Sequence, residues 1–372
     1  MILVVFGTRP EVIKMAPVVH ALRRRGLEVA LAATGQHHDW RMMGSFLECF
    51  SLEVDHWLEL KQRDLMGSFT EILGGLGGLV TRLKPQMVLA AGDTTTVVAA
   101  AFAARKCGSA FGHVESGLRA FSRELPEEEH RICADAIADL CFAPTRIAVD
   151  NLTREHVNGQ ILLTGNPVLD ALRTHFPTRR TSSERESILV TVHRQETVDD
   201  PQKLAQVVAA LGILGKSEHV VWPVHPRTRA KAAEHKIAFP STVKTCEPLG
   251  HVEFLDHLVR ARLVVTDSGG VQEEAAILGT PCVTVRQHTE RPETVEAGVG
   301  LLSGIETAGI LDATSEILSS WERYARAVPH LYGDGRAGEK IADACLAFVE
   351  ARSTATVATK VVGERRILRA AK

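Results

Sequence analysis

The chain has 372 residues and a formal net charge of −2 at pH 7, and 45% of its residues are hydrophobic. That length is enough for two domains of ordinary size, each with a packed core. Because the charge is nearly balanced and no basic stripe is interleaved with aromatic residues, we expect no nucleic-acid partner, no anionic membrane surface and no extensive disorder.

Several sequence features bear on location and on metal binding. The apolar run at residues 2–6 is too short for a signal sequence, and no apolar run reaches the length of a membrane span. We therefore expect a cytoplasmic protein with no membrane partner. The seven cysteines form no C-x-x-C pair, so we interpret them as small core residues in a reducing compartment. The histidines show no metal-binding spacing such as H-x-x-x-H, and no metal is expected.

Strand and helix patterns alternate along the chain, which is typical of parallel sheets built from β-α-β units. The first half predicts, in order, strand 2–6, helix 11–25, strand 28–33, helix 63–84, strand 86–91, helix 94–106, strand 109–114, helix 126–139 and strands 140–142 and 161–163. The second half predicts strand 187–192, helix 201–215, strand 219–223, helix 227–235, strand 243–246, helix 251–260, strand 262–266, helix 271–279 and strand 281–285, with helices over most of 305–351.

These elements predict two doubly wound, Rossmann-like α/β domains that face a cleft. We place the N-terminal domain at residues 1–170 and the C-terminal domain at 171–352, with the polar segment 177–186 as linker and the last helix able to pack back on the N-terminal domain. The tail at 353–372 is small, polar and basic, and we expect it to be poorly ordered. Ligands of such sheets bind beyond the carboxyl ends of the strands, where the motifs below all fall.

The segment Val264–Gly279 is the most informative of these motifs. It predicts a buried strand, a turn with Gly269 and Gly270, and a helix closed by Gly279. Two glycines let backbone N–H groups lie against a ligand, and the helix N-terminus favours an anion such as phosphate. Glu274, one turn into the helix, is placed to accept hydrogen bonds from ribose hydroxyls. An ordinary α/β turn would have the same pattern.

Two motifs of the first half follow strands 2–6 and 86–91. Arg9 and Lys14 lie near a helix start, where two cations could bind phosphate. The surrounding sequence is neither G-x-G-x-x-G nor a P-loop, which argues against a nicotinamide cofactor. Asp93 comes directly after its strand. Capping of the next helix is its default interpretation, and an acid or base in the cleft is the alternative.

The next two motifs supply further carboxylates. His113 and Glu115 share one face at the end of strand 109–114, and an ionisable pair there is costly unless it is partnered or functional. Glu127 stands in the acidic first turn of helix 126–139. Acids are favourable at a helix start for purely electrostatic reasons, so its role stays open at this point.

Three motifs of the second half complete the candidate set. His193 ends strand 187–192 and could donate to a phosphate oxygen or act as an acid. His225 could line the cleft or could be a turn histidine bonded to the backbone. Arg291 belongs to a loop with two arginines and two glutamates beside the glycine turn, a composition that is more often functional than structural.

Taken together, the motifs resemble those of the non-hydrolysing UDP-N-acetylglucosamine 2-epimerases. They stand in family order from Gly7 to about Ala337 and cover nearly the whole chain. The matching segments are GTRPEVIKMAPV, TGQHHDW, GDTTT, HVESGLR, LPEEEHR, TGNPVLDAL, TVHRQE, PVHPRTR, EPLGHVEFL, TDSGGVQEEAAILGTPC, TERPETVEAG and YGDGRA.

The resemblance implies a glycosyltransferase-B-like architecture, a homodimer, and no cofactor or metal. It implies interconversion of UDP-N-acetylglucosamine and UDP-N-acetylmannosamine, in which UDP is eliminated across C1–C2 to give a 2-acetamidoglucal and then adds back. By position it implies catalytic roles for Asp93, Glu115, Glu127 and His193, and it implies UDP-sugar binding by Arg9, Lys14, His225, Phe254, Ser268, Gly269, Gly270, Glu274 and Arg291.

Four positions depart from the family pattern, and other functions remain as alternatives. The departures are Ser116 for Ala, His130 for Asn, Gln195 for Arg or Ala, and Leu249 for Gln. The alternatives are a hydrolysing epimerase that releases N-acetylmannosamine and UDP, an epimerase of a related UDP-sugar, a glycosyltransferase of the same architecture, and a UDP-sugar-binding module without activity.

Overall fold

The computed structural model describes residues 1–35, 43–44, 46–62, 64–122, 125–175 and 185–370. Residues 36–40 of the TGQHHDW motif and residues 177–184 of the expected linker lie outside these ranges. The chain forms two compact units. Unit 1 consists of residues 1–117, 130–171 and 335–372, and unit 2 consists of residues 118–129 and 172–334.

Unit 1 contains a seven-stranded parallel sheet in the order β3-β2-β1-β4-β5-β6-β7. The strands are β1 (Ile2–Phe6), β2 (Val29–Gly35), β3 (His56–Glu59), β4 (Met87–Ala91), β5 (Ala110–Val114), β6 (Leu140–Ala143) and β7 (Gln160–Leu163). Every residue of β1, β4 and β5 is buried, because helices cover both faces of a parallel sheet and leave no polar side to its central strands.

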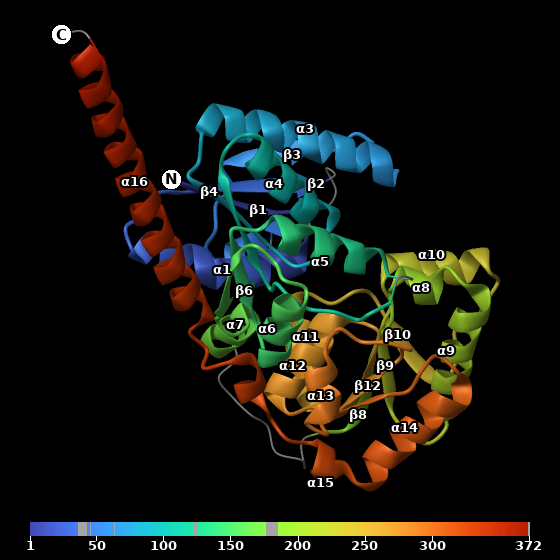
Figure 1. The fold of residues 1–372 in the computed structure, drawn as a ribbon. Helices are drawn as coiled ribbons and strands as arrows, with labels where there is room; N and C mark the ends of the chain where they lie inside the picture. Colours follow the sequence, from blue (N-terminus) through green and yellow to red (C-terminus); the bar gives the residue numbers. More distant parts are fainter. Residues whose placement is uncertain (36–42, 45, 63, 123–124, 176–184, 371–372) are drawn as a thin grey trace. The chain divides into compact units, whose positions relative to one another are not determined.

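The helices of this part of the chain are α1 (Arg9–Arg24), α3 (Leu65–Leu83), α4 (Thr95–Lys106), α5 (Pro126–Ile137), α6 (Arg146–Arg154), α7 (Pro167–His175) and α16 (Ala337–Ala370). Figure 1 shows α1 with α16, and α3 with α4, on opposite sides of the sheet. The C-terminal helix α16 is tied to unit 1 at its start, where Asp170 accepts hydrogen bonds from the N–H groups of Ala337 (3.2 Å) and Gly338 (2.9 Å).

Unit 2 contains a six-stranded parallel sheet in the order β10-β9-β8-β11-β12-β13. The strands are β8 (Ser187–Thr191), β9 (Val220–Pro223), β10 (Val243–Cys246), β11 (Ala261–Thr266), β12 (Cys282–Thr284) and β13 (Gly300–Leu302). The helices are α8 (Gln195–Val198), α9 (Pro201–Leu214), α10 (Pro226–Glu234), α11 (His251–Arg260), α12 (Gly269–Leu278), α13 (Pro292–Glu296), α14 (Thr307–Ser319), α15 (Trp321–Tyr324) and the 3₁₀ turn η2 (Pro329–Tyr332).

The two strand orders confirm the predicted class of two doubly wound α/β sheets. In each sheet the order reverses beside the first strand, between β1 and β4 in unit 1 and between β8 and β11 in unit 2. Ligands of doubly wound sheets bind at the carboxyl ends of the strands at such reversals. Helix α12 ends as predicted at Gly279, whose φ of +75° and close approach to Ala327 N favour glycine.

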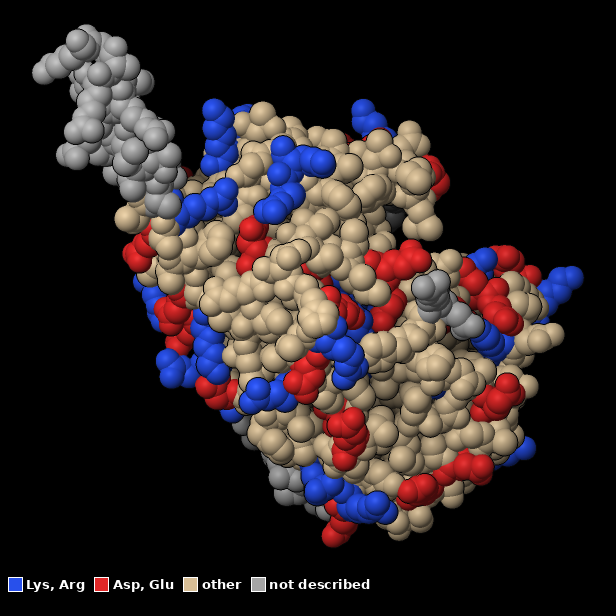
Figure 2. Space-filling view, in the orientation of Figure 1, with Lys and Arg blue, Asp and Glu red and all other residues tan. Residues whose placement is uncertain are grey.

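Burial corrects the interpretation of the cysteines, since Cys49 and Cys107 are exposed while Cys141, Cys282 and Cys345 belong to the core. Burial raises the pKa of Cys282 to about 12, so this thiol stays protonated and inert. Within the described ranges, no helix has the length and apolarity that a membrane crossing requires. Lys and Arg are interspersed with Asp and Glu on the face that Figure 2 shows.

Candidate functional site

Asp93 follows β4 at the strand-order reversal of unit 1. Its Oδ2 accepts hydrogen bonds from Arg131 Nε (3.0 Å) and Nη2 (2.8 Å), and its carbonyl oxygen lies 2.8 Å from His130 Nδ1. The default interpretation of Asp93 as a helix cap is wrong, because α4 has Thr94 as its N-cap residue and the Asp93 carboxylate binds Arg131 instead. Helix α5 thus holds both the side chain and the backbone of Asp93.

Glu115 follows β5, the neighbouring strand. It is buried, and its carboxylate forms a short ion pair with Lys14 Nζ from α1. Its backbone φ of +69° lies in the left-handed region, which costs free energy for a residue with a side chain and occurs at functional sites as well as in turns and helix ends. The ion pair and the backbone conformation together fix one carboxylate beside the Gly92 turn, where a Cβ on Gly92 would lie 3.5 Å from Glu115 Oε2.

His113 lies behind these carboxylates, inside the sheet. Its Nδ1 is 2.6 Å from Asp135 Oδ1, and its Nε2 is 2.8 Å from the carbonyl oxygen of Gly92. A carbonyl only accepts, so Nε2 carries a proton and donates it to Gly92. Of the two alternatives, His113 is thus a partnered histidine, and its ring supports the turn that precedes Asp93.

Glu11 at the start of α1 is a buried carboxylate that the sequence motifs did not single out. It accepts hydrogen bonds from Gly7 N, from Thr8 N (3.0 Å) and from the hydroxyl of Thr94 (2.6 Å). Burial raises its pKa to about 7, against the ordinary value of 4.5, and the three hydrogen bonds offset part of that shift.

Unit 2 presents the N-terminus of α12 after β11, as the glycine motif predicted. Ser268 is the N-cap residue, and the helix begins at Gly269 and Gly270. A Cβ on Gly269 would lie 2.4 Å from Glu290 Oε1, whereas a Cβ on Gly270 would meet no described atom within 4 Å. Gly269 therefore allows Glu290 to approach the helix N-terminus, and Gly270 leaves its other side open.

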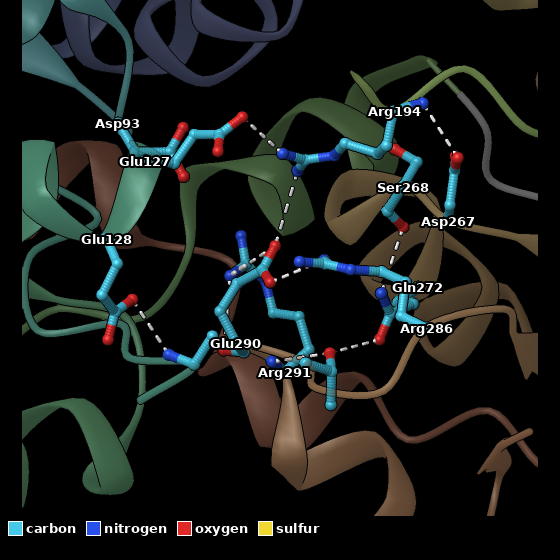
Figure 3. A network of polar contacts seen from close by, with 12 residues as sticks. Asp93, Glu127, Glu128, Arg194, Asp267, Ser268, Gln272, Arg286, Glu290 and Arg291 are labelled. Carbon is cyan, nitrogen blue, oxygen red and sulfur yellow. Dashed lines mark hydrogen bonds and ion pairs between the residues drawn. The ribbon is translucent and has the colours of Figure 1, made fainter. Parts of the chain in front are cut away.

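Three arginines surround this helix start, and Figure 3 shows their side chains directed toward Glu290 or Glu127. Arg286 Nη1 lies 2.8 Å from Glu290 Oε2, and Arg194 Nη2 lies 3.6 Å from Glu290 Oε1. Arg194 Nη1 also lies 2.8 Å from Glu127 Oε1. Arg291 pairs through Nε with Glu273 inside α12. Glu127 is thus an ion-paired carboxylate of unit 2. Its contact with Arg194 is an interaction beyond the favourable effect of an acid in the first turn of α5.

His193 is fixed through its backbone by a buried carboxylate. Asp267, at the end of β11, accepts from His193 N at 3.1 and 3.0 Å and from Arg194 N at 2.8 Å. The ring of His193 lies 5.2 Å from the ring of His225, which is the N-cap residue of α10 and accepts from Arg227 N at 3.2 Å. His225 is therefore a turn histidine bonded to the backbone, and its ring also contacts His193.

Glu274 and Phe254 lie on neighbouring helices. Glu274 Oε1 is 2.8 Å from Nε2 of His251, which orients this carboxylate from α11. Phe254 lies on α11 and is partly exposed. Arg9 stands at the first position of α1, with Cζ 5.7 Å from the centre of the Phe46 ring. Among the described side chains, no group of three or more His, Cys, Asp or Glu is arranged to hold a metal ion.

Sequence reasoning missed the partners of the candidate residues. Arg131, Arg194 and Glu290 stand in the quoted motifs, yet no local pattern indicates which carboxylate or arginine each contacts. Glu11 had a local signal, since Thr8 and Glu11 have the spacing of a helix capping box, but the bond to Thr94 joins residues 83 apart.

Comparison with known proteins gives one consistent family. The family model described as UDP-N-acetylglucosamine 2-epimerase matches residues 20–346. The UDP-N-acetylglucosamine 2-epimerase of Methanococcus maripaludis is 35% identical over 91% of this chain and 96% of its own. The UDP-2,3-diacetamido-2,3-dideoxy-D-glucuronate 2-epimerase of Pseudomonas aeruginosa is 36% identical over 92% of this chain and 98% of its own.

Among solved structures, the UDP-GlcNAc 2-epimerase of Methanocaldococcus jannaschii in complex with UDP-GlcNAc and UDP has a TM-score of 0.86. It is 32% identical and covers 93% of this chain and 99% of its own. This similarity confirms the glycosyltransferase-B-like class of the fold.

Proposed function

The chain belongs to the UDP-N-acetylglucosamine 2-epimerase family, and from this premise we propose that it interconverts UDP-N-acetylglucosamine and UDP-N-acetylmannosamine. The observation that carries the proposal is the pair of carboxylates Asp93 and Glu115 at the ends of neighbouring strands. Each is held by a cation, and Glu115 has a left-handed backbone conformation that costs free energy for a residue with a side chain. A protein that only binds UDP-sugars has no need of such groups.

We assign the UDP group to unit 2. The N–H groups of Gly269 and Gly270 at the start of α12, with the hydroxyl of Ser268, would receive the diphosphate. His193 and Arg291 would supply positive charge or hydrogen-bond donors to it. These five residues suit an anion that gains charge as it leaves, since preorganised donors stabilise developing charge.

The nucleoside would lie on α11 and α12. Glu274, oriented by His251, suits the ribose hydroxyls, and Phe254 offers an apolar surface to uracil. His225, which contacts the ring of His193, would border the same group. From unit 1 we assign Arg9 and Lys14 to the substrate, Lys14 through its ion pair with Glu115.

The reaction needs proton transfer at C2 on both faces of the sugar. One carboxylate takes the C2 proton as the bond from C1 to the UDP oxygen breaks, which gives UDP and a 2-acetamidoglucal. A second acid returns a proton to C2 on the opposite face, and UDP adds back to C1, so that atoms and charge balance. Asp93, Glu115 and Glu127 are the candidate acids and bases, and none of the three is assigned to a particular face of the sugar.

Proton NMR of the enzyme with UDP-N-acetylglucosamine in deuterium oxide tests this function. Deuterium at C2 together with UDP-N-acetylmannosamine is the expected result. Free N-acetylmannosamine with UDP would instead place the enzyme among hydrolysing epimerases. A new glycoside formed only when an acceptor is added would indicate a transferase, and binding without any exchange would indicate a UDP-sugar-binding module.

A second candidate substrate is UDP-2,3-diacetamido-2,3-dideoxy-D-glucuronate. The observation that motivates it is that the Pseudomonas aeruginosa enzyme named for that sugar is 36% identical to this chain. Relatives named for UDP-N-acetylglucosamine are about as similar, at 35% in Methanococcus maripaludis and 37% in Bacillus subtilis. The same deuterium experiment with this sugar decides between them, because the preferred substrate exchanges faster at equal concentration.

We also propose a homodimer in the cytoplasm that needs no metal or other cofactor. Light scattering across a range of protein concentrations tests the dimer, and a constant mass of one chain would contradict it. Fractionation of cells tests the location. Full activity after dialysis against a chelator is the result expected of a metal-independent enzyme.

A further inference from the structure

Glu11 connects the two loops that meet at the strand-order reversal of unit 1. Its Oε2 accepts from Gly7 N and Thr8 N in the loop after β1, and its Oε1 accepts from the Thr94 hydroxyl in the loop after β4. A helix-capping glutamate needs only the bond to Thr8. The bond to Thr94 reaches across to the residue that follows Asp93.

The Thr94 hydroxyl has no part in capping its own helix. Thr94 is the N-cap residue of α4, yet its side chain donates 2.6 Å to Glu11 Oε1 rather than accepting from the helix. This hydroxyl therefore holds the loop after β4, which carries Asp93, against the start of α1 and the loop before it.

We propose that Glu11 is a positioning residue, whose carboxylate joins the loop after β1 to the loop after β4 and so sets the orientation of Asp93. The inference rests on the proposed function, in which Asp93 exchanges a proton with the substrate. Arg131 holds the Asp93 carboxylate and His130 its carbonyl from one side, while Glu11 holds the next residue from the other.

The charge of Glu11 matters for this role. An ionised carboxylate only accepts, and it serves all three donors. A protonated carboxyl carries its proton on Oε1, because Oε2 receives two N–H groups, and the Thr94 hydroxyl then accepts that proton instead of donating. The bond between these neutral groups is weaker than the bond from the hydroxyl to an ionised carboxylate. Because burial raises the pKa of Glu11 to about 7, the connection between the loops weakens as the pH falls through neutrality. The other charged or titratable groups of these loops and of the elements packed on them are Arg9, Lys14, Asp93, His113, Glu115, His130, Arg131 and Asp135.

Two variants separate the connection from the charge. Thr94→Val removes the connecting hydroxyl and leaves both carboxylates, and we expect kcat to fall about 10-fold with KM within twofold, below the roughly 10²-fold or more expected when an acid or base itself is lost. Glu11→Gln keeps an acceptor for both N–H groups and imitates the protonated carboxyl. Its kcat should equal the low-pH plateau of the wild type and show no step near pH 7.

Matched controls stand in the same unit. Thr153→Val removes a hydroxyl that donates 2.8 Å to a backbone oxygen inside α6, on an exposed surface. Glu71→Gln changes a carboxylate that also accepts two backbone N–H groups, from Lys61 (2.8 Å) and Gln62 (3.1 Å). Both controls should keep the kcat and the pH profile of the wild type. A Thr94→Val enzyme with wild-type kcat, or a Glu11→Gln enzyme that retains the step near pH 7, would overturn the proposal.

A readout without substrate distinguishes failure of this inference from failure of the proposed function. In proton–nitrogen NMR spectra, the amides of Gly7 and Asp93 should titrate together with a midpoint near pH 7. Glu11→Gln should abolish both titrations, and Thr94→Val should abolish that of Asp93 alone. If the Asp93 amide does not follow Gly7, the connection is refuted whatever the enzyme's substrate. If it does follow and no UDP-sugar exchanges deuterium, the proposed function alone is refuted.

Discussion

Substitution of Gly269 by alanine tests whether the N-terminus of α12 depends on the close approach of Glu290. Alanine inside a helix normally stabilises relative to glycine by about 0.5–1 kcal/mol. At Gly269, however, the new Cβ would lie 2.4 Å from Glu290 Oε1, and ordinary contact begins at 3.4 Å, so Glu290 must move by about 1 Å.

That movement costs free energy because the Glu290 side chain is buried, so water cannot replace a hydrogen bond that it loses. It is 1% exposed, and its Oε2 lies 2.8 Å from Arg286 Nη1, a distance that a shift of about 1 Å extends beyond hydrogen bonding. A hydrogen bond between charged groups contributes about 1.5–3 kcal/mol. After the helix gain is subtracted, Gly269→Ala should lose about 1–2 kcal/mol in the free energy of unfolding.

Gly270→Ala is the matched control, since no described atom lies within 4 Å of its new Cβ. It should gain up to about 1 kcal/mol, yet it should bind UDP more weakly, because the methyl group occupies the side that we assign to the diphosphate. Urea unfolding measures both stabilities, and titration calorimetry measures both UDP affinities. If Gly269→Ala is as stable as Gly270→Ala, Glu290 is not held at this helix start and the reasoning fails.

Three further outcomes are expected. Glu115→Gln should slow deuterium exchange at C2 by about 10²–10⁴-fold while UDP affinity in calorimetry stays within a few-fold, and unchanged exchange would remove Glu115 from the catalytic set. Asp267→Asn should cost about 1–3 kcal/mol in urea unfolding, because its new amide group faces N–H donors, whereas Asp200→Asn at the N-cap of α9 should cost under about 0.5 kcal/mol. The folded pKa of Glu11 is raised to about 7 from 4.5, so the stability that this group contributes is present below pH 4.5. It should fall by about 3 kcal/mol relative to Glu11→Gln as the pH rises from 4.5 through 7, and the loss should be complete above about pH 7. Parallel stability curves for these two proteins would contradict that last prediction.

The sequence predicts the central strands well because burial on both faces leaves a continuous apolar run. Ile2–Phe6 and Met87–Ala91 are such runs, and both are strands as expected. The edge strand His56–Glu59 was missed, since only alternate residues are partly buried and its four residues carry a weak pattern. Helix Arg146–Arg154 was missed although Thr145, which caps it, gave a usable start signal.

The positions of the candidate residues were predictable, but their partners were not. Strand ends locate Asp93 and Glu115, since the carboxyl ends of parallel strands meet at one edge of a sheet. Their cations come from 38 and 101 residues away, at Arg131 and Lys14, and only the folded chain brings them together. The same distance in sequence hid the bond between Glu11 and Thr94.

The chemistry of Glu11 connects stability to the proposed role. Glutamine would cap α1 as well as glutamate does, and it would avoid the cost of burying a charge. Above pH 7 the ionised carboxylate therefore lowers stability without improving the helix cap. The charge is explained if the acceptor-only form is needed to hold Thr94 beside Asp93. Glu11→Gln should then be the more stable and the slower enzyme at pH 8, a trade of stability for activity that a structural glutamate would not produce.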